Sequence, residues 1–151
     1  MTTYDDVRTR ILTMRDIEHG VGGTATEIAE LAAVCGPLAT DFKQYLEEFG
    51  WLRVGTYELF GVGADVPPHL GVVDRAEELW SGAGMYQIPR ELLPVYDSGG
   101  GWFYCVSKMH RGQPVVCWAH EYEEAGEPQP FDERYESWSQ WVTHHILPYV
   151  G

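Results

Sequence analysis

"VYDSGGGWFYCV", Val95 to Val106, is the stretch of sequence that decides between two kinds of fold. A phosphate-binding loop has the form GxxxxGK[ST] and runs from a strand into a helix. Here no Lys-Ser or Lys-Thr follows the glycines, and the aromatic and apolar residues from Trp102 to Val106 favour a strand. Because glycine adopts positive φ without strain, we predict a tight turn that opens a central strand.

Helical periodicity dominates the first third of the chain. The clearest case is the stretch from Thr40, where Phe42, Tyr45, Leu46 and Phe49 follow the spacing i, i+3, i+4, i+7. The pattern predicts helices at Thr3–Ile17, in a short segment capped by Thr24 or Thr26, at Thr40–Phe49, at Asp74–Trp80 and at about Arg134–Leu147.

Strand-like segments occupy the middle of the chain, separated by glycine- and proline-containing turns. They are "WLRV", "YELFGV", Met85–Ile88 with Leu92–Tyr96, Gly101–Lys108 and Pro114–His120. An acidic, proline-bearing stretch then leads to the last helix. Short hairpin connections favour antiparallel pairing. We therefore predict one α+β domain over residues 1–151, with a twisted, mostly antiparallel sheet packed against N-terminal helices and a C-terminal helix.

Charge is the strongest compositional signal, because the chain has 10 Lys and Arg but 23 Asp and Glu, which gives a net charge of −13. Affinity for nucleic acid comes mainly from Lys and Arg, so this balance argues against DNA, RNA and anionic membranes as partners. It favours a basic protein partner, while solubility alone is the simpler explanation. No secretory signal or membrane span is evident, and three scattered cysteines suit the cytoplasm.

Residues that could carry chemistry are present, but none forms a recognised motif. His120 lies beside Glu121, Glu123 and Glu124, yet the HExxH zinc motif needs a second His where Glu124 stands. The adjacent pair His144-His145 would point in different directions on a helix. Cys105, Cys117, Ser98 and Ser107 lack a GxSxG signature, although a Cys–His pair assembled by the fold stays open. We predict no catalytic residue, no metal site and no cofactor.

Five segments in order resemble motifs of the SUKH superfamily, which contains fungal cell-wall-synthesis regulators and bacterial immunity proteins of polymorphic toxin systems. They are "LATDFKQYLEEFGW", "YELFGV", "IPRELLPVYDSGGGWFYCV", "GQPVVCWAHE" and "FDERYESWSQWVTHHIL", and the resemblance covers about residues 24–148. Two details depart from the usual pattern. Gly50-Trp51 follows Phe49 where Asn-Gly is common, and Trp138 and Trp141 stand where smaller side chains are usual.

The resemblance implies an α+β domain that binds proteins and does not catalyse a reaction. For bacterial members it implies stoichiometric neutralisation of a cognate toxin, often a nuclease and therefore basic, and it leaves the oligomeric state open. Two alternatives remain: a regulatory adaptor for a housekeeping protein, and a metal-dependent enzyme using His120 and the glutamates beside it. As residues that bind the toxin we predict the aromatic anchors Tyr96, Trp102 and Tyr122 and the acidic rim Asp97, Glu121, Glu123, Glu124 and Glu127.

Overall fold

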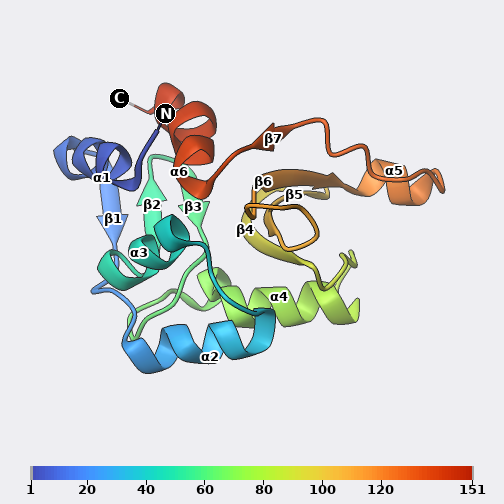
Figure 1. Cartoon of the computed structure of the whole chain (residues 1–151), viewed down its shortest axis with the longest axis horizontal. Helices are drawn as coiled ribbons and strands as arrows, with labels where there is room; N and C mark the ends of the chain where they lie inside the picture. The colour runs from blue at the N-terminus through green and yellow to red at the C-terminus, as the bar shows by residue number, and fades with distance from the viewer. Residues whose placement is uncertain (1, 151) are drawn as a thin grey trace.

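The computed structural model describes residues 2–150 and begins with three helices, the third of which contacts the other two (Figure 1). They are α1 (Tyr4–Thr13), α2 (Ala25–Cys35) and α3 (Thr40–Glu48). Capping boxes begin α1 and α2, because the Thr3 and Thr24 hydroxyls accept hydrogen bonds from amides of the first turn. The predicted second helix, with Thr24 as its cap, and the predicted third helix from Thr40 are confirmed. No helix within residues 2–150 is long and apolar enough to cross a membrane.

The first helix is shorter than predicted. It ends at Thr13 rather than Ile17, and Ile17–His19 forms an edge strand, β1. Ile17 lies opposite Val54 in the antiparallel pair, so its side chain is partly buried by a strand partner distant in sequence. This long-range pairing overrides the helical spacing that Val7, Ile11 and Met14 suggest for the segment.

A three-stranded antiparallel sheet, ordered β1-β2-β3, follows from the two short segments predicted as strands. β2 (Leu52–Val54) and β3 (Tyr57–Leu59) are joined by a two-residue turn at Gly55 and Thr56. Gly55 has a φ of 60°, a conformation that glycine adopts without steric cost. The predictions for "WLRV" and "YELFGV" are confirmed.

The second sheet is antiparallel with the order β4-β5-β6-β7 and contains the stretch from Val95 to Val106. Its strands are β4 (Leu92–Gly99), β5 (Trp102–Ser107), β6 (Val115–Ala119) and β7 (Arg134–Tyr135). Gly99 lies opposite Trp102, so Gly100 and Gly101 form a two-residue hairpin turn. Both have positive φ, 67° and 86°, as a type I′ turn requires. The predicted turn into a central strand is confirmed.

Met85–Ile88, predicted as a strand, forms none. Met85 is 84% exposed, and the Ile88 amide donates to the carbonyl of Leu79 in α4 (Val72–Ser81). The Gln87 side chain likewise donates to the Trp80 carbonyl. The segment therefore completes the C-terminal end of α4 instead of joining a sheet, because the last carbonyls of a helix need donors.

The end of the chain also differs from the prediction of one helix from Arg134. Arg134 and Tyr135 pair with β6 as strand β7, and α6 (Trp138–Trp141) begins after Ser137, whose hydroxyl accepts from the Gln140 amide. A π-helical segment, Val142–Ile146, and a 3₁₀ turn, Leu147–Tyr149, continue it. The acidic, proline-bearing stretch begins with a short helix, α5 (His120–Glu124).

The two sheets meet just after β3. The Phe60 amide donates to the Val95 carbonyl in β4 at 3.1 Å, and the Phe60 carbonyl accepts from the Tyr45 hydroxyl at 2.8 Å. The Tyr45 ring is fully buried and stacks on Trp138 of α6 with ring centroids 4.4 Å apart. This junction therefore connects α3, both sheets and α6 in a single core.

Replacing Tyr45 by Phe tests the junction. The Tyr45→Phe variant keeps the ring stack but leaves the Phe60 carbonyl without this donor, and we expect it to lose about 1–3 kcal/mol of unfolding free energy. Urea unfolding measures the loss. Tyr149→Phe is the matched control, because Tyr149 is 71% exposed and its change should fall within about 0.5 kcal/mol. Equal midpoints for the two variants would contradict a role for this hydrogen bond.

Candidate protein-binding site

The structure divides the eight predicted partner-binding residues between two places. Tyr96 and Asp97 lie at a cleft of about 590 Å³ that is lined by β3, β4 and α4. Trp102, Glu121 and Tyr122 line a smaller pocket of about 140 Å³ at the end of the second sheet. The other three, Glu123, Glu124 and Glu127, are exposed and follow Tyr122 in the same segment of the chain.

Tyr96 and Asp97 have internal partners. The half-buried Tyr96 ring lies against Tyr57, Tyr104 and Trp141, and burial raises its pKa. The Asp97 carboxylate accepts from the Arg75 guanidinium and from the Gly99 amide, both at 2.8 Å. These contacts order the end of β4 and join it to α4, so both residues have a structural role in the cleft wall.

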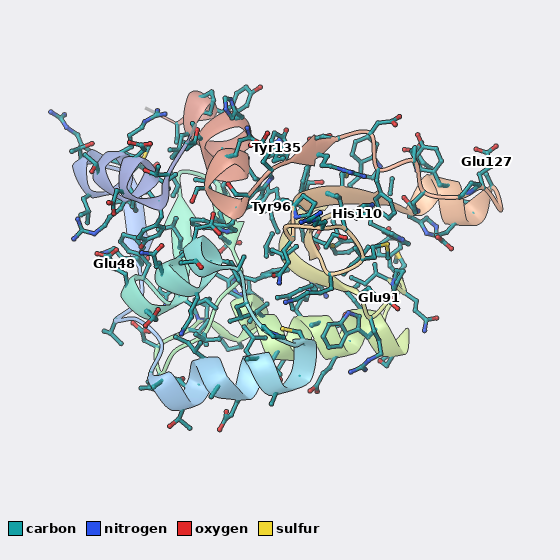
Figure 2. The ribbon with its side chains drawn as sticks, in the orientation of Figure 1. Glu48, Glu91, Tyr96, His110, Glu127 and Tyr135 are labelled. Atoms are coloured by element: carbon teal, nitrogen blue, oxygen red, sulfur yellow. The ribbon has the colours of Figure 1, made fainter. Side chains whose placement is uncertain are left out.

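The second group belongs to what we call the acidic arm, residues 120–133. It contains six acidic residues and no Lys or Arg. Figure 1 shows its helix α5 at one end of the molecule, beyond the second sheet, and Figure 2 places Glu127 at the outermost edge of that view. Within residues 2–150 no Lys or Arg forms an ion pair with any of these six carboxylates. The arm therefore presents uncompensated negative charge.

The Gln129 side chain helps to hold the returning half of the acidic arm against the sheet. The Gln129 amide oxygen accepts from the Ala119 amide at 3.0 Å, and its nitrogen donates to the Ala119 carbonyl at 2.7 Å. Gln129 thus takes the place of a strand neighbour at the end of β6. Sequence reasoning missed this residue, because only the three-dimensional pairing shows that Ala119 needs a partner there.

The glycine turn positions the base of the acidic arm. The Gly101 carbonyl accepts from the His120 amide at 2.9 Å. A Cβ at position 101 would lie 2.8 Å from the His120 Cβ and 3.0 Å from the Tyr86 ring, so only glycine fits. The turn therefore sets both the β4–β5 hairpin and the direction in which α5 leaves the sheet.

The small pocket at the base of the acidic arm combines aromatic rings with carboxylates. Trp102, Tyr122 and Phe131 contribute rings, while Glu121, Asp132 and Glu133 contribute carboxylates. Phe131 has a φ of 50°, a backbone conformation that costs a bulky residue about 1–2 kcal/mol. The sequence analysis did not predict Phe131, Asp132 and Glu133 as site residues. They belong to the same acidic stretch as Glu121, and this was the signal that could have identified them.

Glu133 connects this pocket to the C-terminal helix. One of its carboxylate oxygens accepts from the Tyr104 and Tyr135 hydroxyls at 2.7 and 3.0 Å, and His145 lies 3.6 Å away. The His145 ring packs on Tyr104 and Trp141. Burial lowers the pKa of His145, and the Glu133 carboxylate opposes part of that shift.

The structure also places the His and Glu side chains that could bind a metal and the cysteines that could act as nucleophiles. His120 and Glu124 approach to 3.6 Å across one helical turn, and within residues 2–150 no three His, Cys, Asp or Glu side chains form a group that could hold a metal ion. Burial raises the pKa of all three cysteine thiols, that of Cys117 to about 12. A thiol with a raised pKa carries little thiolate at neutral pH, which disfavours nucleophilic use of the cysteines.

Comparisons with known proteins agree with this description of an α+β domain. The model of the SMI1-KNR4 cell-wall family, SUKH_5, matches residues 27–147, so the chain belongs to the SUKH superfamily. Members of this superfamily are generally non-catalytic immunity or regulatory proteins. No curated protein matches the sequence.

A solved structure supports the fold over nearly the whole length. A crystal structure of a protein from Pseudomonas syringae pv. tomato aligns with a TM-score of 0.70 and 18% sequence identity. The alignment covers 95% of this chain and 98% of that one. At this identity the likeness establishes the fold alone, and function has to be argued from the residues.

Substitution at the glycine turn tests its role in positioning the acidic arm. We expect Gly101→Ala to lose roughly 2–4 kcal/mol of stability, because it combines a strained positive φ with the collision against His120. Gly100→Ala is the matched control, since its φ is also positive but nothing lies within 4 Å, and it should lose only about 1 kcal/mol. Thermal or urea unfolding of both variants checks this; equal losses would mean that the turn does not contact the arm.

The lowered pKa of His145 predicts a pH dependence of stability. The folded state keeps His145 neutral where the unfolded chain binds a proton, so its contribution is present above the ordinary value of 6.5 and is lost as the pH falls below it. Urea unfolding at pH 7.5 and 5.5 should therefore show a smaller loss on acidification for His145→Gln than for the wild type. His144→Gln, which changes an exposed neighbour, should keep the wild-type difference. If His145→Gln loses as much stability between pH 7.5 and 5.5 as the wild type does, His145 is not the source of the pH dependence.

Proposed function

We propose that this chain is an immunity protein that neutralises a cognate toxin by stoichiometric binding, without turnover. The observation that carries the proposal is the acidic arm, with six carboxylates, no Lys or Arg, and a position at one end of the molecule. Membership of a superfamily that includes immunity proteins supports it. The target that suits this surface is a basic toxin such as a nuclease, which needs positive charge to hold its polyphosphate substrate.

The charge of the acidic arm suits rapid capture of such a toxin. The arm carries −6 of the net −13 of the whole chain. A concentrated negative patch steers a basic partner and raises the association rate toward about 10⁸–10⁹ M⁻¹s⁻¹ at low salt. Screening by salt shortens the reach of this field to roughly 8 Å at physiological ionic strength. Association that slows with added salt is therefore the expected kinetic signature.

The arrangement of the acidic arm also suits a standard protein interface. Such interfaces bury roughly 800 Å² on each partner and combine a few aromatic anchors with a polar rim. Trp102 and Tyr122 provide accessible aromatic groups at the pocket, and Glu121, Glu123 and Glu124 on α5 provide exposed carboxylates. Inhibition then follows from covering the toxin's substrate-binding surface, and no group on this chain has to react.

The first test is binding to the product of the neighbouring gene. We expect one-to-one association by calorimetry, an association rate that falls with salt, and protection of cells that express that product. A neighbouring product that is not toxic and does not bind would overturn the proposal. Selective recovery of a housekeeping protein, with cells tolerating deletion of the gene, would instead support the regulatory adaptor.

Charge reversal tests the acidic arm itself. The triple change Glu121→Lys, Glu123→Lys and Glu124→Lys should slow association about tenfold or more at low salt and change dissociation less. The control reverses Glu30, Glu47 and Glu77, which are equally exposed and lie on α2, α3 and α4. Both variants have the same net charge, so stopped-flow rates that are equal for the two would show that the arm is not the docking surface.

A further inference from the structure

The geometry points to a specific use of the small pocket at the base of the acidic arm: it holds one arginine side chain of a basic protein partner. This inference rests on the proposed function for the partner's identity as a toxin. The pocket has a volume of about 140 Å³, so it admits a single long side chain and not a helix or a strand. Three aromatic residues and three acidic residues are among those that line it.

The exposure of Trp102, which is much higher than that of the other tryptophans, indicates a ligand at this pocket. The chain has six tryptophans, and the other five are at most 7% exposed, whereas Trp102 is 42% exposed. Within residues 2–150 neither Trp102 nor Tyr122 stacks on another aromatic ring. A large aromatic side chain that is left accessible at the edge of a pocket is the residue type most enriched in binding hot spots.

The protein's own arginines supply the second argument. Three of them lie over aromatic rings elsewhere: Arg53 over Trp51, Arg75 over Phe103 and Arg90 over Trp80, at 4.7–5.7 Å from the ring centroids. Within the described chain no Lys or Arg lies over Trp102 or Tyr122. The pocket is thus an aromatic surface beside carboxylates for which the chain provides no cation of its own.

The carboxylates decide which cation fits. Glu133 is held at the pocket by the Tyr104 and Tyr135 hydroxyls, and Glu121 and Asp132 line it as well. A guanidinium can stack its flat face on an indole ring while its edge donates two parallel hydrogen bonds to a carboxylate. An ammonium offers neither the plane nor the fork, so arginine is favoured over lysine.

The larger cleft does not offer the same chemistry. Its one arginine, Arg75, already lies between Glu78 and Asp97 at 2.8 Å from each, and its Tyr96 ring is packed against other rings. Glu58 at the same cleft contacts Arg53 and His69. Of the carboxylates that line this cleft, only Asp74 has no ion pair with Lys or Arg within residues 2–150, whereas none of the three at the small pocket has one. The small pocket is therefore the better match for an external cation.

The test uses N-acetylarginine amide as the probe and follows the Trp102 indole N–H and the backbone amides of residues 119–122 by NMR. We expect weak, saturable shifts at these groups and none with N-acetylcitrulline amide, its neutral counterpart. Trp102→Leu keeps an apolar side chain but removes the ring, and Glu121→Gln removes one charge. Each should weaken binding roughly tenfold, the scale of one cation–π or charge-assisted contact, whereas the exposed-site control Tyr149→Leu should not.

Several results would overturn the proposal. The first is that the citrulline probe causes equal shifts, and the second is that the shifts lie at another surface. The third is that both pocket variants bind the arginine probe with unchanged affinity while the rest of their spectra match the wild type. A parallel measurement separates the pocket from the proposed function. If a cognate toxin binds Trp102→Leu as tightly as the wild type, the pocket proposal fails while immunity stands. If the arginine probe binds the pocket and the neighbouring product is no toxin, the proposed function fails while the pocket remains.

Discussion

The hydrogen bond from the Phe60 amide to the Val95 carbonyl is the contact on which the rest of the structure depends, because it joins the two sheets. Its geometry relies on a close backbone approach next to it. A Cβ at Gly61 would lie 1.7 Å from the Gly50 carbonyl oxygen, and that oxygen accepts from the Val62 amide at 2.8 Å. No other residue fits at position 61, so the "LFGV" segment after α3 ties the helices to β4 and through it to the glycine turn.

Sequence reasoning predicted those elements whose signals are local. The Thr24 capping box, the spacing in α3 and the paired glycines at 100 and 101 each act within a few residues, and the structure has all three where predicted. It failed at Ile17, Met85 and Arg134. There the outcome depends on a partner distant in the chain or in another element: Val54 opposite Ile17, α4 beside residues 85–88, and β6 beside Arg134. Periodicity carries no information about such partners.

The candidate site shows the same division. Composition was enough to single out the acidic stretch, but it could not separate Asp97, which is paired with Arg75, from the acidic residues that have no cation. Nor could it rank the aromatic residues, because Tyr96 and Trp102 differ only through register and packing. Tyr96 faces Trp141 and His145, whereas Trp102 is the first residue of β5 and is 42% exposed.

The distribution of positive charge explains why the acidic arm stands out. With ten Lys and Arg against 23 acids, most carboxylates must lack a cation, yet the arginines that form ion pairs, Arg8, Arg53 and Arg75, all lie outside the arm. Like charges concentrated in fourteen residues repel one another and oppose folding of that segment. The fold offsets this repulsion with neutral contacts, the Gln129 amide on Ala119 and the His120 amide on Gly101. A segment that is held in place without neutralising its charge keeps that charge for an external cation.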